Sequence, residues 1–132
     1  MKIYPTLRYD DPRAAPDWLE RVIGFESVAV HEGEDGKTEH AEMCWGEDGK
    51  IEHAEMCRGE DLIVFGAPTE TMPKSPVILY LTREDPDAAH AKAKAAGGEI
   101  TMELVDQDYS NREFAVGDPE GHTWSFGTYE PR

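Results

Sequence analysis

The stretch DPEGHTWSF, residues 118–126, begins with four turn-forming residues and continues with a segment in which ring-bearing and hydroxyl side chains alternate. Its first four residues are turn formers, because Pro119 presets φ for the first central position and Gly121 tolerates a positive φ. In the residues that follow, a ring-bearing side chain occupies every second position, which is the period of a strand with one buried face. The stretch therefore predicts a tight turn that leads into a strand with an aromatic face.

The sequence before this turn predicts one helix among further strands. NREFAVGD (111–118), EITMELVD (99–106) and VILYLT (77–82) are typical of strands in their content of β-branched and aromatic residues. DPDAAHAKAKAAGG (85–98) predicts a helix that an aspartate caps and two glycines end. The C-terminal half should therefore follow the order βαβββ.

The N-terminal half predicts the same order. KIYPTLRY (2–9) is typical of a strand, and a helix is expected from near Pro12 to Gly24. An apolar stripe runs along that helix through Trp18, Leu19, Val22 and Ile23. The strands expected after it are Phe25 to His31, Glu39 to Trp45 and Leu62 to Phe65.

The loop TETMPKSP is the only plausible internal boundary. We therefore expect a single domain, 1–132, with a first βαβββ module at 1–68, a linker at 69–75 and a second module at 76–130. At 132 residues, the chain is long enough to fold around one core without a disulfide or a structural metal.

A tandem duplication interrupts the first module. EDGKTEHAEMCWG (34–46) is followed at once by EDGKIEHAEMCRG (47–59), and eleven of the thirteen positions are identical. Two such short units cannot build a solenoid, so we interpret the repeat as a local duplication. The second copy runs directly into Leu62 to Phe65 and is expected to pair with that strand. The first copy is then expected to be looped out, to cross over or to pair with another chain.

The formal net charge of −15 excludes nucleic acid and anionic membranes as partners and is compatible with a cationic ligand or with a solvated acidic surface. The two cysteines belong to the two copies of the duplication, so they do not indicate a disulfide framework. No apolar run of ~18 residues and no signal-peptide pattern is present. These features predict a cytoplasmic protein.

DWLERVIGF, AHAKAKAAGGEI and DPEGHTWSF, together with the twofold βαβββ order, resemble the vicinal oxygen chelate superfamily. This superfamily includes glyoxalase I, extradiol dioxygenases and bleomycin resistance proteins, and the likeness is to its PhnB-like or bleomycin-resistance-like branch. The resemblance implies an α+β fold in which two βαβββ modules form a curved mixed sheet around a cavity. It also implies a homodimer.

The resemblance further implies a divalent metal held by His and Glu side chains. The corresponding positions fall at Tyr4, at Val77 or Ile78, at Phe65 or Gly66, and at Ser125. None of them carries an imidazole or a carboxylate, so no metal cofactor is expected. The alternative is a divalent metal with relocated ligands among His40, Glu42, His53, Glu55 and His122. Of these, His122 alternates with the aromatic residues of its strand and is interpreted as a hydrogen-bonded structural histidine.

We therefore predict a small-molecule binding protein that sequesters an aromatic or cationic compound without a metal. The side chains expected to line the cavity are Tyr4, Trp45, Tyr80, Tyr109, Arg112, Phe114, Trp124 and Ser125. The alternative is core packing for Trp45, Tyr80, Tyr109, Phe114 and Trp124, and a surface ion pair with Glu113 for Arg112. DQDYSNRE (106–113) is the predicted rim. A metal-dependent lyase, isomerase or dioxygenase, and assembly through the duplicated strand, are the alternative functions. Whether the protein is an enzyme stays open, although no nucleophile motif is present.

Overall fold

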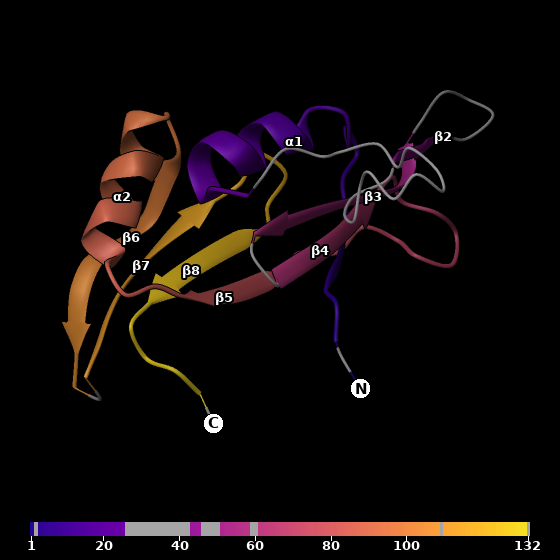
Figure 1. The fold of residues 1–132 in the computed structure, drawn as a ribbon. Coiled ribbons are helices and arrows are strands. Elements are labelled where there is room, and N and C mark those ends of the chain that lie inside the picture. Colours follow the sequence, from indigo (N-terminus) through magenta and orange to yellow (C-terminus); the bar gives the residue numbers. More distant parts are fainter. Residues whose placement is uncertain (2, 26–42, 46–50, 59–60, 109, 132) are drawn as a thin grey trace, which may run out of the picture. The chain divides into compact units, whose positions relative to one another are not determined.

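The computed structural model describes residues 1, 3–25, 43–45, 51–58, 61–108 and 110–131 (Figure 1). The chain forms two compact units, Met1–Glu20 with Gly24–Ser75 and Arg21–Ile23 with Pro76–Arg132. Each unit contains one four-stranded mixed sheet and follows the order βαβββ, which confirms the predicted fold class. The finer module bounds at 68 and 76 stay a prediction.

In the first unit, β1 (Thr6–Arg8) lies parallel to β4 (Asp61–Gly66). β3 (Ile51–Arg58) lies antiparallel between β4 and β2 (Met43–Trp45), so that the strand order is β1-β4-β3-β2. The strand register places the buried apolar residues on one face, and the ring of Tyr9 meets Phe65 edge-on at 6.1 Å. The apolar residues buried on that face are Leu7, Ala54, Met56, Ile63 and Phe65, while Cys57 of β3 is buried in the alternate row.

The first helix is shorter than predicted. α1 covers Ala15–Trp18, with Pro16 in the first turn, where its missing N–H leaves no helical hydrogen bond unmade. The helix continues as one turn of π-helix, η1 (Leu19–Ile23). Gly24 ends it with φ of 100°, as predicted, and its N–H donates to the Leu19 carbonyl oxygen at 2.9 Å.

The second unit repeats the plan of the first. β5 (Ile78–Thr82) lies parallel to β8 (Thr123–Gly127), while β7 (Asn111–Gly117) and β6 (Glu99–Gln107) extend the sheet antiparallel in the order β5-β8-β7-β6. β6 is an edge strand, and its pairing with β7 has two register shifts. α2 (Pro86–Ala95) contacts three of these strands (Figure 1).

The core of the second unit lies between α2 and one face of its sheet. The rings of Phe114 and Phe126 stack at a centroid distance of 4.9 Å, and the His90 imidazole meets Phe114 edge-on at 5.2 Å. Neighbouring groups crowd Gly98 just after the helix, because a Cβ added there would lie 2.8 Å from a methyl group of Val22, 3.0 Å from the Ala93 backbone oxygen and 3.1 Å from a methyl group of Val116. Glycine is therefore required there for packing.

The turn that opened the sequence analysis is organised by one buried carboxylate. The side chain of Asp118 accepts hydrogen bonds from the backbone N–H of Glu120 at 2.9 Å, from that of His122 at 3.0 Å and from Trp124 Nε1 at 3.3 Å. Gly121 has φ of 95°, as the turn requires. His122 Nδ1 accepts a hydrogen bond from the Val77 N–H at 3.1 Å, which confirms a structural histidine.

The second copy of the duplication forms β3 and pairs with β4, as expected. The first copy provides β2, which pairs with β3 of the same chain. The expectation that the first copy must loop out, cross over or pair with another chain is therefore wrong for residues 43–45. It assumed a strand at Phe25 to His31 beside β3, and residues 26–31 lie outside the described part of the chain.

We predict that Asp118→Ala lowers the free energy of unfolding by about 3 kcal/mol, because it leaves buried N–H donors without an acceptor. Urea denaturation measures this loss. The control is Asp108→Ala, which removes the same group from an exposed position beyond β6 and should change stability by no more than about 0.5 kcal/mol. Equal losses in the two variants would contradict the role given to Asp118.

Candidate functional site

The sheet of the second unit has a second face, turned away from α2, which we call the distal face. Strand register places Tyr80, Ser125 and Ala115 in one row across it, and Glu113 lies beside Gly127 in the next row. Side chains alternate along a strand, so these residues point away from the buried Phe114, Trp124 and Phe126. Ile78 and Tyr80 on this face are 78% and 38% exposed.

A chain of hydrogen bonds ties four segments together on the distal face. Tyr80 Oη donates to the backbone oxygen of Tyr129 at 2.6 Å and lies 3.4 Å from Asn111 Oδ1. Asn111 Oδ1 accepts from the Tyr129 N–H at 2.9 Å, and Asn111 Nδ2 donates to the Glu113 carboxylate. Gln107 Nε2 donates to the same carboxylate at 3.4 Å. These five residues are the polar cluster discussed below.

Gly127 makes room for the polar cluster. A Cβ added at this position would lie 2.5 Å from Asn111 Oδ1 and 2.6 Å from Tyr80 Oη, which is closer than real Cβ contacts. β8 therefore needs a glycine beneath the tyrosine hydroxyl and the asparagine amide. The absence of this one side chain lets Tyr80 and Asn111 share the Tyr129 backbone.

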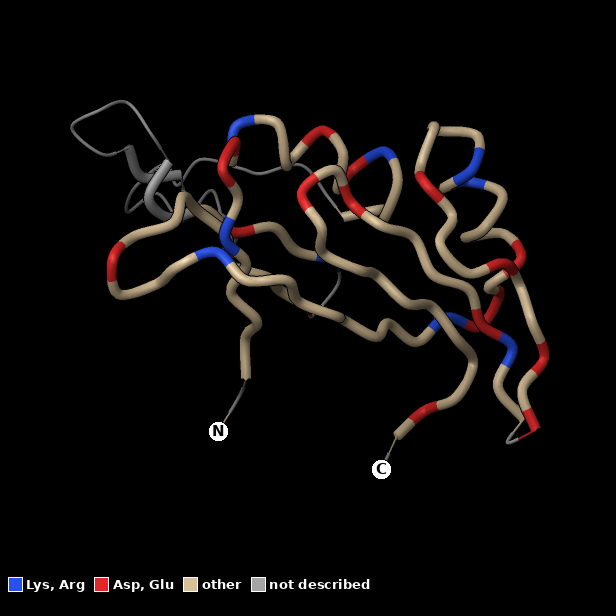
Figure 2. Tube along the Cα trace, turned by 180° about the vertical axis from the view of Figure 1, so that it is seen from behind, with Lys and Arg blue, Asp and Glu red and all other residues tan. Residues whose placement is uncertain are grey.

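The cluster combines an aromatic ring with an oriented carboxylate. Glu113 is partly buried, and the hydrogen bonds from Asn111 and Gln107 fix its orientation through neutral amides that do not cancel its charge. A carboxylate accepts hydrogen bonds from ammonium or amidine groups, and a tyrosine face attracts cations and flat rings. Acidic positions also recur along both units of the trace (Figure 2), and the chain as a whole has a formal net charge of −15.

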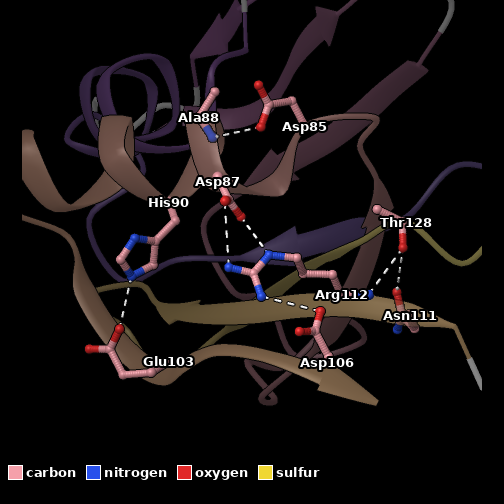
Figure 3. A network of polar contacts seen from close by, with 9 residues as sticks. All are labelled: Asp85, Asp87, Ala88, His90, Glu103, Asp106, Asn111, Arg112 and Thr128. Atoms are coloured by element: carbon pink, nitrogen blue, oxygen red, sulfur yellow. Dashed lines mark hydrogen bonds and ion pairs between the residues drawn. The ribbon is translucent and has the colours of Figure 1, made fainter. Parts of the chain in front are cut away.

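Arg112 faces the opposite way and belongs to a second network, which fastens α2 to the sheet (Figure 3). Its Nε donates to Asp87 Oδ1 at 2.7 Å and its Nη1 donates to Asp106 Oδ1 at 3.2 Å. The hydrogen bonds to Asp87 and then to Asp106 raise the pKa of Arg112 above its usual value. A separate contact between α2 and β6 joins His90 Nε2 to Glu103 Oε1 at 2.9 Å.

The structure distributes the predicted cavity residues over several environments. Tyr80 and Ser125 lie together on the distal face, whereas Phe114 and Trp124 are fully buried in the core and take the core-packing alternative. Arg112 takes the surface alternative, but its partners are Asp87 and Asp106 rather than its neighbour in sequence. Tyr4 is exposed before β1, Trp45 lies in β2 by its backbone, and Tyr109 is outside the described residues.

The structure describes only part of the alternative set of metal ligands. His122 is buried and bonded to backbone, and Glu55 is partly buried in β3. His53 is placed by its backbone only, opposite Cys44, while His40 and Glu42 lie outside the described residues. Within the described ranges, no three His, Cys, Asp or Glu side chains converge as metal ligands.

The residues at the positions that the resemblance marks for metal do not fit a divalent ion. In the second unit, Ile78 and Ser125 offer one hydroxyl between them. In the first unit, Phe65 is core and Gly66 has no side chain. A divalent ion needs several oxygen or nitrogen donors to replace its hydration shell. The donor set thus does not fit the divalent metal that the resemblance implies.

The sequence prediction missed Asn111, Glu113, Gln107 and Gly127. Three of them lie in the segment 106–113, which was predicted as the rim. Alternation with Phe114 on β7 would have placed Asn111 and Glu113 on the face away from the core. Gly127 carries no sequence signal, because its role depends on the register between β8 and its two neighbours.

Comparison with known proteins places this geometry among relatives. The sequence model of the Glyoxalase/Bleomycin resistance protein/Dioxygenase superfamily matches residues 3–126. An uncharacterized protein of Mycobacterium bovis is 31% identical over 124 residues, which cover 93% of this chain and 80% of the relative.

Two solved structures show the same fold. TioX from Micromonospora sp. ML1 has a TM-score of 0.72 and 26% identity, with 98% of this chain and 100% of that chain covered. TnmS3, an antibiotic binding protein from Streptomyces sp. CB03234, has a TM-score of 0.70 and 18% identity, with 96% and 94% covered. Among the described helices, none is long and apolar enough to cross a membrane.

We predict that Gly127→Ala displaces Tyr80 and Asn111 and lowers the free energy of unfolding by about 2 kcal/mol, because the added methyl group overlaps the polar cluster. Thermal denaturation measures the loss, and the Tyr80 ring resonances in an NMR spectrum should shift. Gly117→Ala is the matched control, since its Cβ would meet only the Thr101 methyl at 3.1 Å. The role of Gly127 is contradicted if both variants behave alike.

Proposed function

Because this chain belongs to the Glyoxalase/Bleomycin resistance protein/Dioxygenase superfamily, we propose that it is a binding protein that sequesters a cationic aromatic small molecule without a metal. The observation that carries the proposal is the polar cluster on the distal face, in which the Glu113 carboxylate and the Tyr80 ring share one sheet surface. The antibiotic binding of TnmS3, a relative in fold, is a precedent for this class of function.

Each part of the cluster has a role in the proposed binding. The Tyr80 ring offers a flat apolar surface for a planar group, and such cation–π contacts contribute roughly 0.5–2 kcal/mol. Glu113 pairs with a positive charge on the ligand, and a hydrogen bond to a charged partner contributes about 1.5–3 kcal/mol. Asn111 and Gln107 hold the carboxylate in place, so it is ordered before the ligand arrives. The net charge of −15 attracts a cation to this surface.

Sequestration requires neither a nucleophile nor a metal. It is therefore compatible with a distal face that carries hydroxyl, amide and carboxylate groups but no convergent metal-ligand set among the described side chains. A homodimer in the cytoplasm completes the proposal. The homodimer is proposed from the family resemblance. The reducing compartment is proposed from the cysteine pattern, in which the described Cys57 is a buried thiol outside any disulfide.

We predict that the protein binds proflavine, a planar cation, more tightly than acridone, its neutral ring analogue. Equilibrium dialysis measures both affinities. Glu113→Gln should weaken proflavine binding by about 10- to 100-fold, because it removes the charged partner, and should leave acridone binding unchanged. Glu70→Gln makes the same change in net charge from an exposed loop of the other unit and should leave both affinities as they are.

The variant Tyr80→Phe removes the hydroxyl and keeps the ring, so it tests which of the two groups the ligand needs. If the ring is the platform, this variant should keep proflavine binding within about threefold, and Tyr80→Ala should lose it by roughly tenfold. The proposal is overturned if the wild-type protein binds neither compound, or if it binds both equally and Glu113→Gln has no effect.

Metal analysis tests the rival class of function, a metal-dependent lyase, isomerase or dioxygenase. We predict that protein purified without chelator contains only trace zinc, nickel, manganese and iron by elemental analysis. About one ion per chain that disappears in the His40→Ala/His53→Ala variant would refute the metal-free proposal and identify relocated ligands. Metal that persists in this variant would refute the metal-free proposal as well.

A further inference from the structure

β3 is the strand that completes the core of the first unit. Its residues 54–58 pair antiparallel with β4, where Met56 lies opposite Ile63 and Cys57 opposite Leu62. Met56 is fully buried and Cys57 is 7% exposed. The pairing partner that β4 needs is therefore a short strand with a methionine and a cysteine at these two positions.

The first copy of the duplication carries the same residues at the same spacing. Met43 and Cys44 correspond to Met56 and Cys57, and Trp45 corresponds to Arg58. The first copy already lies next to the second as β2, where Met43 pairs with Ala54 and Cys44 pairs with His53. β2 and β3 thus come from two nearly identical sequences and lie side by side in the sheet. Of these two described strands, β3 is the one that pairs with β4.

We infer that the two copies are interchangeable partners of β4, so that the chain has a second folded state in which the first copy takes the place of β3. In that state Met43 lies opposite Ile63, Cys44 lies opposite Leu62 and Trp45 lies opposite Asp61. The core side chains of the strand are unchanged by the exchange, because the two copies differ only at 38/51 and 45/58. Antiparallel pairing and strand direction are preserved as well.

Two features favour the observed state. The second copy reaches β4 through two residues, 59–60, whereas the first would need the fifteen residues 46–60, and loop closure then favours the second copy by about 20-fold. Arg58 Nη1 also donates to the backbone oxygen of Gly24 at 3.1 Å, and replacing it by tryptophan removes this guanidinium donor. Arg58 therefore favours the second copy as the partner of β4. The observed state also has a fourth strand, β2, which the exchanged state lacks.

The exchange allows the first copy to replace β3 as the partner of β4 when the second copy is damaged. A substitution that damages the core position of the second copy would move the equilibrium to the first copy instead of unfolding the unit. The second copy would then lie in the loop, where the damaged residue has no core to disturb. Rescue of this kind does not depend on ligand binding at the distal face.

The test compares Met43→Asp, Met56→Asp and the double variant in the full-length protein by urea denaturation. We expect Met43→Asp to lower the midpoint less than Met56→Asp does, since in the observed state position 43 lies on the edge strand opposite Ala54 and not opposite β4. Met56→Asp should keep a cooperative transition at a lower midpoint. The double variant should lose the cooperative transition of the first unit, because neither copy can then fill the position opposite Ile63.

Thiol labelling identifies which copy pairs with β4, because the cysteine of the pairing copy is buried. In wild type, Cys57 should react slowly, because it is buried. In Met56→Asp, Cys57 should react more than about tenfold faster, while Cys44 becomes the protected thiol. Arg58→Trp should move labelling in the same direction without damage to the core. The swap variant Arg58→Trp/Trp45→Arg keeps the composition of the wild type and should move labelling further, because it gives the arginine to the first copy.

Met56→Asp that is as damaging as the double variant would overturn the inference. Fast labelling of both cysteines in folded Met56→Asp would overturn it too, because it would indicate local unfolding rather than exchange. A double variant as stable as wild type would remove the premise that β4 needs this methionine. A Met56→Asp protein with a larger mass than wild type by light scattering would show exchange between chains and would refute exchange within one chain.

Discussion

The parallel pairing of the first and last strands of each unit is the constraint on which the rest of the fold depends. β5 and β8 run side by side in the same direction, as β1 and β4 do. A chain cannot join parallel neighbours by a tight turn, so it must leave the sheet and return. In the second unit α2 forms the connection outside the sheet. It covers the sheet face on which Phe114, Trp124 and Phe126 are buried. The strands that follow then fill the sheet by antiparallel pairing and leave the other face available for polar chemistry.

The sequence was sufficient for the elements of the second unit, because local chemistry decides them. Asp85 accepts the hydrogen bond from Ala88 N–H that caps α2, and the turn at Gly121 has the backbone conformation that its glycine indicated. Alternation also placed His122 correctly. The candidate site was only partly predictable, because its cluster depends on which rows of neighbouring strands coincide. Phe114 and Trp124 show the difficulty, since an aromatic strand face predicts burial but does not say which face the helix covers.

The first unit shows where sequence reasoning fails for a physical reason. The argument that the duplicated strand must reverse the chain was sound only if another strand already occupied the edge beside β3. Edge positions are set by long-range pairing, which period and composition do not reveal. The structure gives that edge to the first copy at residues 43–45. A repeat that looked like surplus sequence is thus part of the sheet.

The edge strand β6 has a consequence for how this chain meets another copy of itself. It is long, and its outer hydrogen-bonding groups are the kind of template on which foreign strands add. Glu99, Glu103 and Asp106 are spaced along it, and two register shifts interrupt its regular geometry. If two such edges met, the carboxylates of one would lie near the carboxylates of the other. The irregular backbone of each strand would also interrupt the hydrogen bonds between them. The register shifts and the acidic residues, of which Glu103 and Asp106 also have partners in their own chain, therefore make β6 an unfavourable template for an added strand.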